Sequence, residues 1–159
     1  MSNAYVYAQI AEAMIAAINA AWVPDTFASV IIQHDTEPKS IQQIIGGAFV
    51  NLRPLEVRSD PKGLNAAVQS TDDLYRFEVI VYFPEPAATG TVNANVPFLK
   101  MDYASLLVAK TQTGDGFGGV ANFCYQTGVD MKDRNPGFEG SRSMRVTWEC
   151  RTQRQYFPT

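Results

Sequence analysis

Residues 74–83, LYRFEVIVYF, constrain the fold of this chain more than any other segment. Aromatic and β-branched residues at every second position predict a strand with one fully apolar face. The opposite face carries Arg76 and Glu78, but Ile80 and Tyr82 make it partly apolar. Because both faces carry apolar side chains, we expect this strand to lie in the middle of a sheet. Its apolar face comprises Tyr75, Phe77, Val79, Val81 and Phe83.

A second alternating segment, residues 143–155, predicts another half-buried strand. Tyr156 and Phe157 follow it as an aromatic pair, which either folds back onto the domain or anchors in a neighbouring subunit. If the pair contacts another chain, cutting after Thr152 should leave a folded subunit that assembles poorly, whereas loss of folding would assign the tail to the core. The positions expected to face the core are Met144, Val146, Trp148 and Cys150.

Two segments have the period of amphipathic helices. Residues 4–21 are rich in alanine, and Pro24 prevents the helix from continuing. A second helix, at about 97–111, begins with Pro97 in the first turn. The apolar stripe of the first helix comprises Tyr7, Ile10, Met14, Ile18 and Ala21.

The remaining segments complete a single domain over residues 1–159. In the strand expected at about 48–57, Pro54 indicates an edge position or a bulge. The order α-β-β-β-α-β-β predicts an α+β fold, with a mainly antiparallel sheet packed against two helices and connected by long loops. Further strands are expected at about 27–34, 48–57 and 120–129, and loops at 58–73, 84–96, 114–119 and 131–141.

Charge and targeting features narrow the classes of function. The net charge is −3 and no long basic run occurs, so we expect no sequence-specific nucleic-acid binding. Gln9 and Glu12 interrupt the N-terminal apolar run, which we interpret as a helix of the mature domain and neither a signal nor a membrane segment. Residues 71–130 carry three basic and seven acidic groups, whereas residues 131–159 carry six and three. This contrast would suit head-to-tail contact between copies.

No pattern of catalytic, cofactor-binding or metal-binding residues emerges. His34 is the only histidine, and we interpret it as an exposed residue at a strand end. The glycine-rich residues 114–119 follow a helix and open a strand, the reverse of a phosphate-binding loop. Aspartates 72 and 73 should end a loop, and three further acids should be solvated loop charges: Asp130, Asp133 and Glu139.

The two cysteines, Cys124 and Cys150, both lie in predicted strands. They could pair if those strands are neighbours. Because we find no secretory signal, we expect free, buried thiols.

Five pieces of the chain, in their order and spacing over residues 4–155, resemble the tail-terminator and related tail-completion proteins of long-tailed bacteriophages. They are AEAMIAAINAAW, AFVNLRPLEVRSDPKG, DLYRFEVIVYF, FLKMDYASLLVAK and RSMRVTWECRTQ. The resemblance implies a virion structural protein without catalytic residues or cofactors. It implies a ring, commonly of six copies, that assembles in the bacterial cytoplasm and stands at the head-tail junction of the virion.

In that family the ring caps the tail tube, so the implied partners are other copies of the chain, the tail tube protein and the head-tail connector or neck protein. Phage DNA would be able to pass through the ring. Segments 84–96 and 131–142 are longer than in a minimal member. Sheet edges, loops and termini usually supply the contacts, so the interface candidates are Arg151, Arg154, Tyr156, Phe157, Pro86, Thr91, Asn93 and Arg134.

Two other interpretations remain open at the level of sequence. One is a head-completion, neck, tube or sheath protein of the same kind of particle. The other is a small enzyme or ligand-binding α+β domain with a pocket between loops 84–96 and 114–119.

Overall fold

The chain forms an α+β domain with a five-stranded sheet. The computed structural model describes residues 3–22, 27, 29–62, 69–85, 99–105 and 123–156, and residues 99–105 form a helical segment. The labelled elements are α1 (Asn3–Trp22), β1 (Val30–His34), the 3-10 turn η1 (Ile41–Gln43), β2 (Ala48–Lys62), β3 (Gln69–Pro84), β4 (Phe123–Asp130) and β5 (Ser141–Tyr156).

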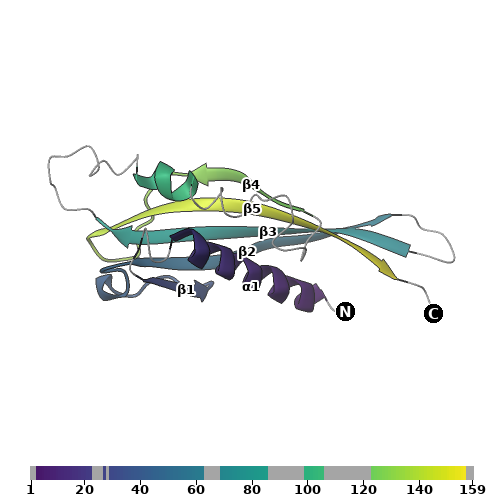
Figure 1. Cartoon of the computed structure of the whole chain (residues 1–159), viewed down its shortest axis with the longest axis horizontal. Coiled ribbons are helices and arrows are strands. Elements are labelled where there is room, and N and C mark those ends of the chain that lie inside the picture. Colours follow the sequence, from purple (N-terminus) through teal and green to yellow (C-terminus); the bar gives the residue numbers. More distant parts are fainter. Residues whose placement is uncertain are drawn as a thin grey trace.

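The strands lie in the order β1-β2-β3-β5-β4 (Figure 1). β1 pairs with β2 in parallel, and every other neighbouring pair is antiparallel. β3, which contains the alternating segment 74–83, is the central strand, so that prediction is confirmed. The predicted fold class is confirmed as well.

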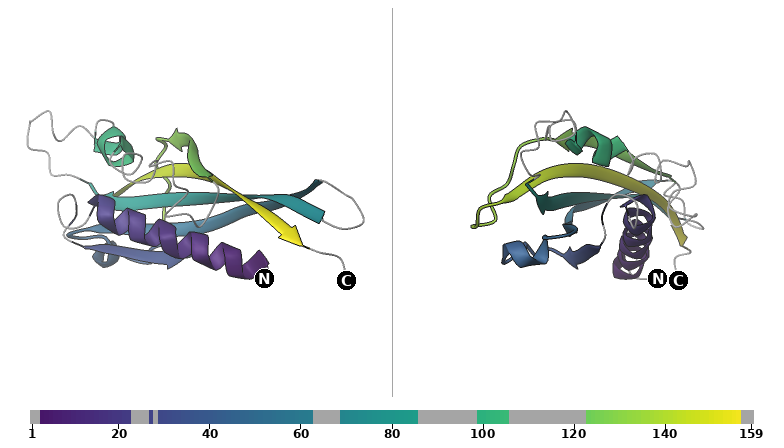
Figure 2. Two further views of the ribbon diagram at one scale, coloured as in Figure 1. Left: turned by 45° about the vertical axis from the view of Figure 1, so that its right-hand side comes forward. Right: turned by 60° about the vertical axis from the view of Figure 1, so that its left-hand side comes forward.

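Helix α1 covers one face of the sheet, which we call the inner face. Figure 2 shows the sheet curving over the helix. Ile10, Met14 and Ile18 of the predicted stripe are buried there, and the ring of Tyr7 stacks on Phe77 of β3 at 5.4 Å between ring centroids. The strand positions predicted to face the core are buried in the same cluster: Tyr75, Phe77, Val79, Val81, Phe83, Met144, Val146, Trp148 and Cys150.

The segment 99–105 is attached to the C-terminal end of α1. The indole Nε1 of Trp22 donates a hydrogen bond to the carbonyl oxygen of Tyr103 at 3.1 Å. The ring of Tyr103 lies against Phe27 and Phe83, with centroids 4.8 and 5.2 Å away. This segment therefore belongs to the same core as α1.

Gly47 lets β1 lie close beside the start of β2. A Cβ atom at this position would stand 2.1 Å from the carbonyl oxygen of Ser29. The same oxygen accepts a hydrogen bond from the backbone N–H of Ala48 at 3.0 Å. Only glycine permits this approach without a shift of the backbone.

The predicted loop at 58–73 is wrong, because β2 and β3 continue through most of it. Their ladder extends to the pair of Lys62 with Ser70. Asp73 therefore lies within a strand, where it is buried and accepts a hydrogen bond from the Ser59 hydroxyl at 2.6 Å. Pro61 is tolerated because β2 has a partner on only one side there within the described ranges.

Pro54 marks the point where β2 becomes an edge. The register shifts between Pro54 and Glu56, which confirms the predicted bulge. β1 ends opposite Leu52, so from Arg53 onward β2 pairs only with β3 in the described part of the chain.

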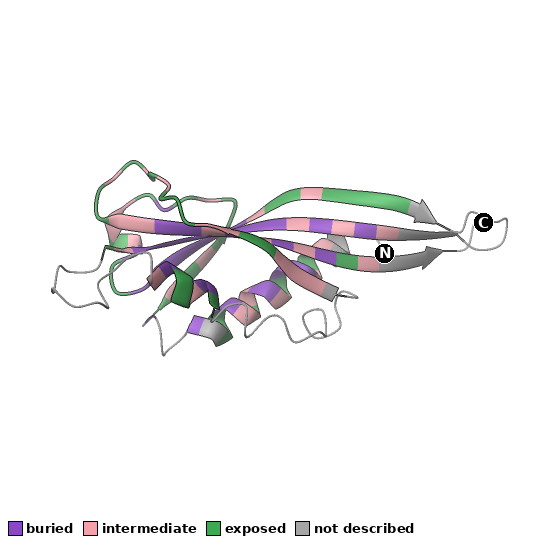
Figure 3. Ribbon diagram, turned by 90° about the horizontal axis from the view of Figure 1, so that it is seen from above, coloured by how far each residue is buried: buried purple, intermediate pink, exposed green. Residues whose placement is uncertain are grey.

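Past the helix-covered region, β2, β3 and β5 form a three-stranded extension that we call the open arm: residues 58–62, 69–74 and 151–156. In Figure 1 these strands reach past the N-terminal end of α1. Figure 3 shows exposed residues along β2 here, next to alternating burial along β3. β4 pairs with β5 only as far as Arg151, so both edges of the arm are open among the residues described.

Candidate interaction surface

The face of the sheet opposite α1, the outer face, carries opposite charges on neighbouring strands. Arg53 of β2 lies across from Glu78 of β3. Two strand positions further, Arg76 of β3 lies between Glu56 on β2 and Glu149 on β5. These residues alternate along their strands with the buried residues of the inner face, so their side chains lie together on the outer face. There they form cross-strand pairs.

Glu78 is the centre of this face. Only 3% of its side chain is exposed, although it carries a charge. Its Oε1 lies 2.8 Å from Arg145 Nη1 and 2.9 Å from Arg134 Nη2, and its Oε2 lies 3.7 Å from Arg53 Nη1. A buried carboxylate is tolerated when cations surround it and donate hydrogen bonds.

Two further acids complete the cluster and make it neutral overall. Asp130 of β4 lies 2.7 Å from Arg145 Nη2, and Asp35 lies 2.9 Å from Arg53 Nε. The hydrogen bond to Glu78 raises the pKa of Arg145, with Asp130 adding to the effect. A hydrogen bond from the backbone N–H of Lys132, together with Arg145, lowers the pKa of Asp130. These pairs join β2, β3, β5 and the end of β4 through their side chains.

A second group of polar contacts fastens the edge strand β4 nearer the arm. The Tyr125 hydroxyl donates a 2.6 Å hydrogen bond to Glu149 Oε2. That bond, with some burial, raises the pKa of Tyr125. Glu149 Oε1 in turn lies 3.4 Å from Arg76 Nε, and Arg76 Nη1 lies 3.3 Å from Glu56.

The loop at residues 131–140 is clamped to the body by Asp133. Its carboxylate lies 2.8 Å from the Nζ of buried Lys100 and 2.9 Å from Arg142 Nη2, and it accepts a hydrogen bond from the Ser143 N–H. Burial alone would raise the pKa of Asp133, but these donors outweigh it and lower the pKa to about 2. The prediction of simple solvated charges is wrong for Asp133 and for Asp130, whereas Glu139 is exposed.

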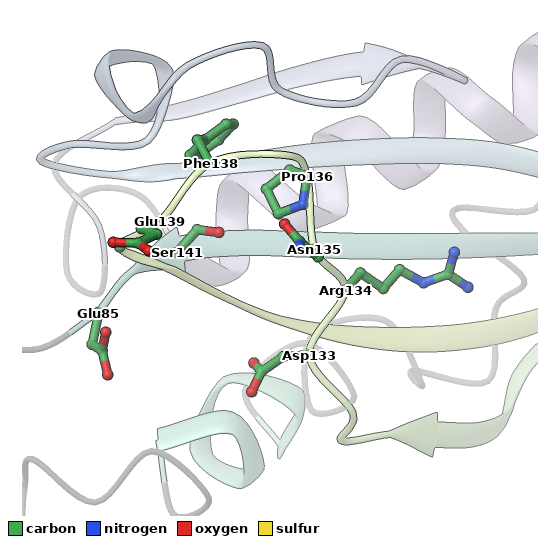
Figure 4. A pocket seen from close by; sticks show the side chains of 9 residues that line it. Glu85, Asp133, Arg134, Asn135, Pro136, Phe138, Glu139 and Ser141 are labelled. Atoms are coloured by element: carbon green, nitrogen blue, oxygen red, sulfur yellow. The ribbon is translucent and has the colours of Figure 1, made fainter.

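The same loop borders an open hollow of about 690 Å³ (Figure 4). Its lining comes from Glu85 and from residues 133–136 and 138–141. Figure 4 shows the side chains of Phe138, Arg134 and Asp133 pointing in different directions. A site for a small ligand would need polar groups that converge on one point. The proposed pocket between loops 84–96 and 114–119 lies outside the described residues, apart from positions 84 and 85.

The interface candidates from the sequence fall into three groups. Arg134 lies over the outer face, in the cluster around Glu78. Arg151 is exposed where the arm begins, while Arg154 and Tyr156 continue β5 opposite Thr71 and Gln69. The candidates outside the described residues are Pro86, Thr91, Asn93 and Phe157.

Sequence reasoning missed the side chains that organise this surface. Arg76 and Glu78 were assigned to the correct face, but their partners Arg53, Arg145 and Glu149 were not foreseen. The available signal was the charge at alternate positions of all three strands. It identifies the face and leaves the partners open until the strand register is known.

Within the described ranges, no group of three or more His, Cys, Asp or Glu residues could hold a metal ion. None of the helices described is both long enough and apolar enough to span a membrane. No model of a known protein family matches the chain, and no curated protein matches its sequence.

Proposed function

We propose that this chain is a virion structural subunit, a tail terminator that assembles as a ring, closes the tail tube of a long-tailed bacteriophage and joins it to the neck. Its partners would be further copies of itself, the tail tube protein and the connector or neck protein. In this role the protein acts through contacts between subunits and not through chemistry on a substrate.

The open arm is the observation that carries the proposal. From Arg53 on β2 and from Thr152 on β5, each strand has a partner on one side only among the described residues. Free strand edges present unpaired N–H and C=O groups, and they aggregate unless another chain or a covering segment pairs with them. A subunit of a closed ring has such a partner in every neighbouring copy.

Apolar side chains along the same edge support a contact there. Leu55 and Val57 of β2 are 46% and 47% exposed, directly after the point where β1 ends. Exposed apolar residues on an unpaired strand favour association, because burying them adds to the main-chain hydrogen bonds of strand pairing. We therefore assign the β2 edge from Arg53 to Lys62 to the contact between copies.

The charged outer face has a different role in this proposal. Its arginines and acids already pair within the subunit around Glu78, and Glu78 itself is almost fully buried. A cluster that is satisfied internally keeps the sheet rigid and offers little net attraction to a partner. The contact between copies would therefore run along the arm.

The proposal is tested with the full chain and isolated tail tubes. Native mass spectrometry should detect a closed oligomer, alone or after tubes are added, and electron microscopy should detect a ring on one end of each tube. A protein that stays monomeric at high concentration and leaves both tube ends bare would contradict the proposal. Density in the neck or along the tube, and not at the tube end, would replace the terminator with another component of the particle.

A pair of matched variants tests the assigned edge. Val57→Lys places a charge on the open β2 edge and should weaken self-association or tube binding roughly tenfold or more. Met101→Lys makes the same kind of change at a residue that is 53% exposed on the segment 99–105, away from the arm. It should assemble as the parent chain does. Equal effects of the two changes would remove the β2 edge from the contact.

A further inference from the structure

Cys124 and Cys150 lie directly opposite each other on neighbouring strands. β4 and β5 pair in a register that places Cys124 across from Cys150. Both thiols are free, as the sequence predicted; Cys150 is fully buried, and Cys124 is only partly so. Both side chains belong to the inner face, at the margin of the core beneath the sheet.

The two thiols are also in contact. A side-chain hydrogen bond joins Cys150 to Cys124, and this bond, together with burial, raises the pKa of Cys150. Side chains opposite each other in an antiparallel pair have Cβ atoms about 4.5–5.5 Å apart. A disulfide requires about 3.5–4.5 Å between Cβ atoms, so a small approach of the two strands suffices to join the sulfurs.

We propose that Cys124 and Cys150 form an oxidisable dithiol, which a small disulfide oxidant such as glutathione disulfide converts into one cross-strand disulfide within the subunit.

Oxidation takes two thiol–disulfide exchange steps, and the more exposed thiol, that of Cys124, reacts first. The partly exposed Cys124, as its thiolate, attacks one sulfur of glutathione disulfide; the S–S bond of the oxidant breaks, and one glutathione thiolate leaves. Cys150 then gives up its proton, and its sulfur attacks the Cys124 sulfur of the mixed disulfide, which expels the second glutathione thiolate. In total the protein loses two protons and two electrons, and the oxidant takes them up to become two glutathione thiols.

The new bond would hold the edge strand β4 to the sheet. Among the residues that the structure describes, β4 has a strand on one side only, and its ladder with β5 is interrupted by a register shift between Gln126 and Gly128. The disulfide would close the chain between residues 124 and 150, a segment that includes the clamped loop 131–140. Constraining a long segment of this kind restricts the unfolded chain.

Mass spectrometry of the full, folded chain after incubation with glutathione disulfide tests the proposal. The parent chain should lose the mass of two hydrogen atoms. A titration of free thiols should then detect neither cysteine, and it should detect both again after reduction by dithiothreitol. Digestion without reduction should yield one crosslinked peptide that contains both cysteines.

Two variants separate the roles of the two thiols, with circular dichroism to check that each is folded. Cys150→Ala keeps the accessible thiol and should stop at the mixed disulfide, with the mass of one glutathione added. Cys124→Ala should keep its buried thiol unmodified while folded. A parent chain that accumulates a glutathione adduct, forms disulfide-linked dimers or keeps both thiols would overturn the proposal, whatever the variants do.

Discussion

The helix-covered body of the sheet and the open arm share the strands β2, β3 and β5, but they differ in what flanks and covers these strands. In the body, α1 buries the inner face, and the cluster around Glu78 pairs the charges of the outer face. In the arm, β2 and β5 each pair on one side only among the described residues, and Val57, directly before the arm on the same open β2 edge, is about half exposed.

This difference separates stability from association. The free energy of folding should reside in the body, because apolar burial and buried ion pairs are concentrated there. The arm adds ladder hydrogen bonds, and none of its residues whose burial the structure describes belongs to the apolar core, so substitutions in it should act mainly on assembly.

The largest effect on stability is expected from Phe77→Ala. Phe77 is fully buried under α1 and stacks on Tyr7, so its removal leaves a cavity between helix and sheet. The free energy of unfolding in urea should fall by about 3–5 kcal/mol. Val57→Ala, on the open β2 edge directly before the arm, should cost less than about 0.5 kcal/mol. Similar losses for the two variants would mean that this edge is part of the folding core.

Glu78→Gln should have the next largest effect. The change leaves Arg53, Arg134 and Arg145 around a neutral amide in a buried site, so stability should fall by about 3 kcal/mol. The matched change Glu56→Gln alters a carboxylate that is 35% exposed, so solvent screens its ion pairs and the loss should be much smaller than for Glu78→Gln. Urea unfolding at neutral pH measures both, and a negligible loss for Glu78→Gln would show that the cluster is not stabilising.

A smaller, pH-dependent effect is expected at Asp133. Its pKa is lowered from 3.8 to about 2 in the folded protein, so the carboxylate stabilises the fold above about pH 4 and loses this contribution as the pH falls towards 2. The side chain is 39% exposed, which limits the contribution to less than about 1 kcal/mol.

The measurement is urea unfolding of the parent chain and Asp133→Asn at pH 6 and pH 2. The variant should be less stable at pH 6, and the difference should nearly vanish at pH 2. Glu139→Gln, an exposed position in the same loop, should differ little from the parent at either pH. A difference for Asp133→Asn that persists at pH 2 would attribute the effect to packing and not to charge.

Much of the body could be predicted from the sequence, because its signal is local. Alternation in β3 and β5 identified the inner residues, and the period of α1 identified the stripe that covers them. The bulge after Pro54 followed from the missing backbone donor.

The polar contacts and the arm could not be predicted in the same way. Alternation fixes the face of a residue, but the partners of Glu78 depend on strand register and on the loop that carries Arg134. The clamp between Lys100 and Asp133 joins residues 33 positions apart. In the arm, Asp60 and Pro61 have the composition of a turn, and the ladder between β2 and β3 overrides that local preference.

The smallest effect on stability, and the sharpest division between body and arm, is expected from truncation after Thr152. This cut removes the β5 residues that pair with residues 69–72, but it leaves every buried residue from Met144 to Cys150 in place. Unfolding should stay cooperative, with a loss below about 1 kcal/mol, because frayed strand ends contribute little to global stability. Self-association and tube binding should fall far more, since one edge of the arm is lost. A truncated chain that no longer unfolds cooperatively would instead assign the end of β5 to the core, and one that still forms rings would restrict the contact to the β2 edge.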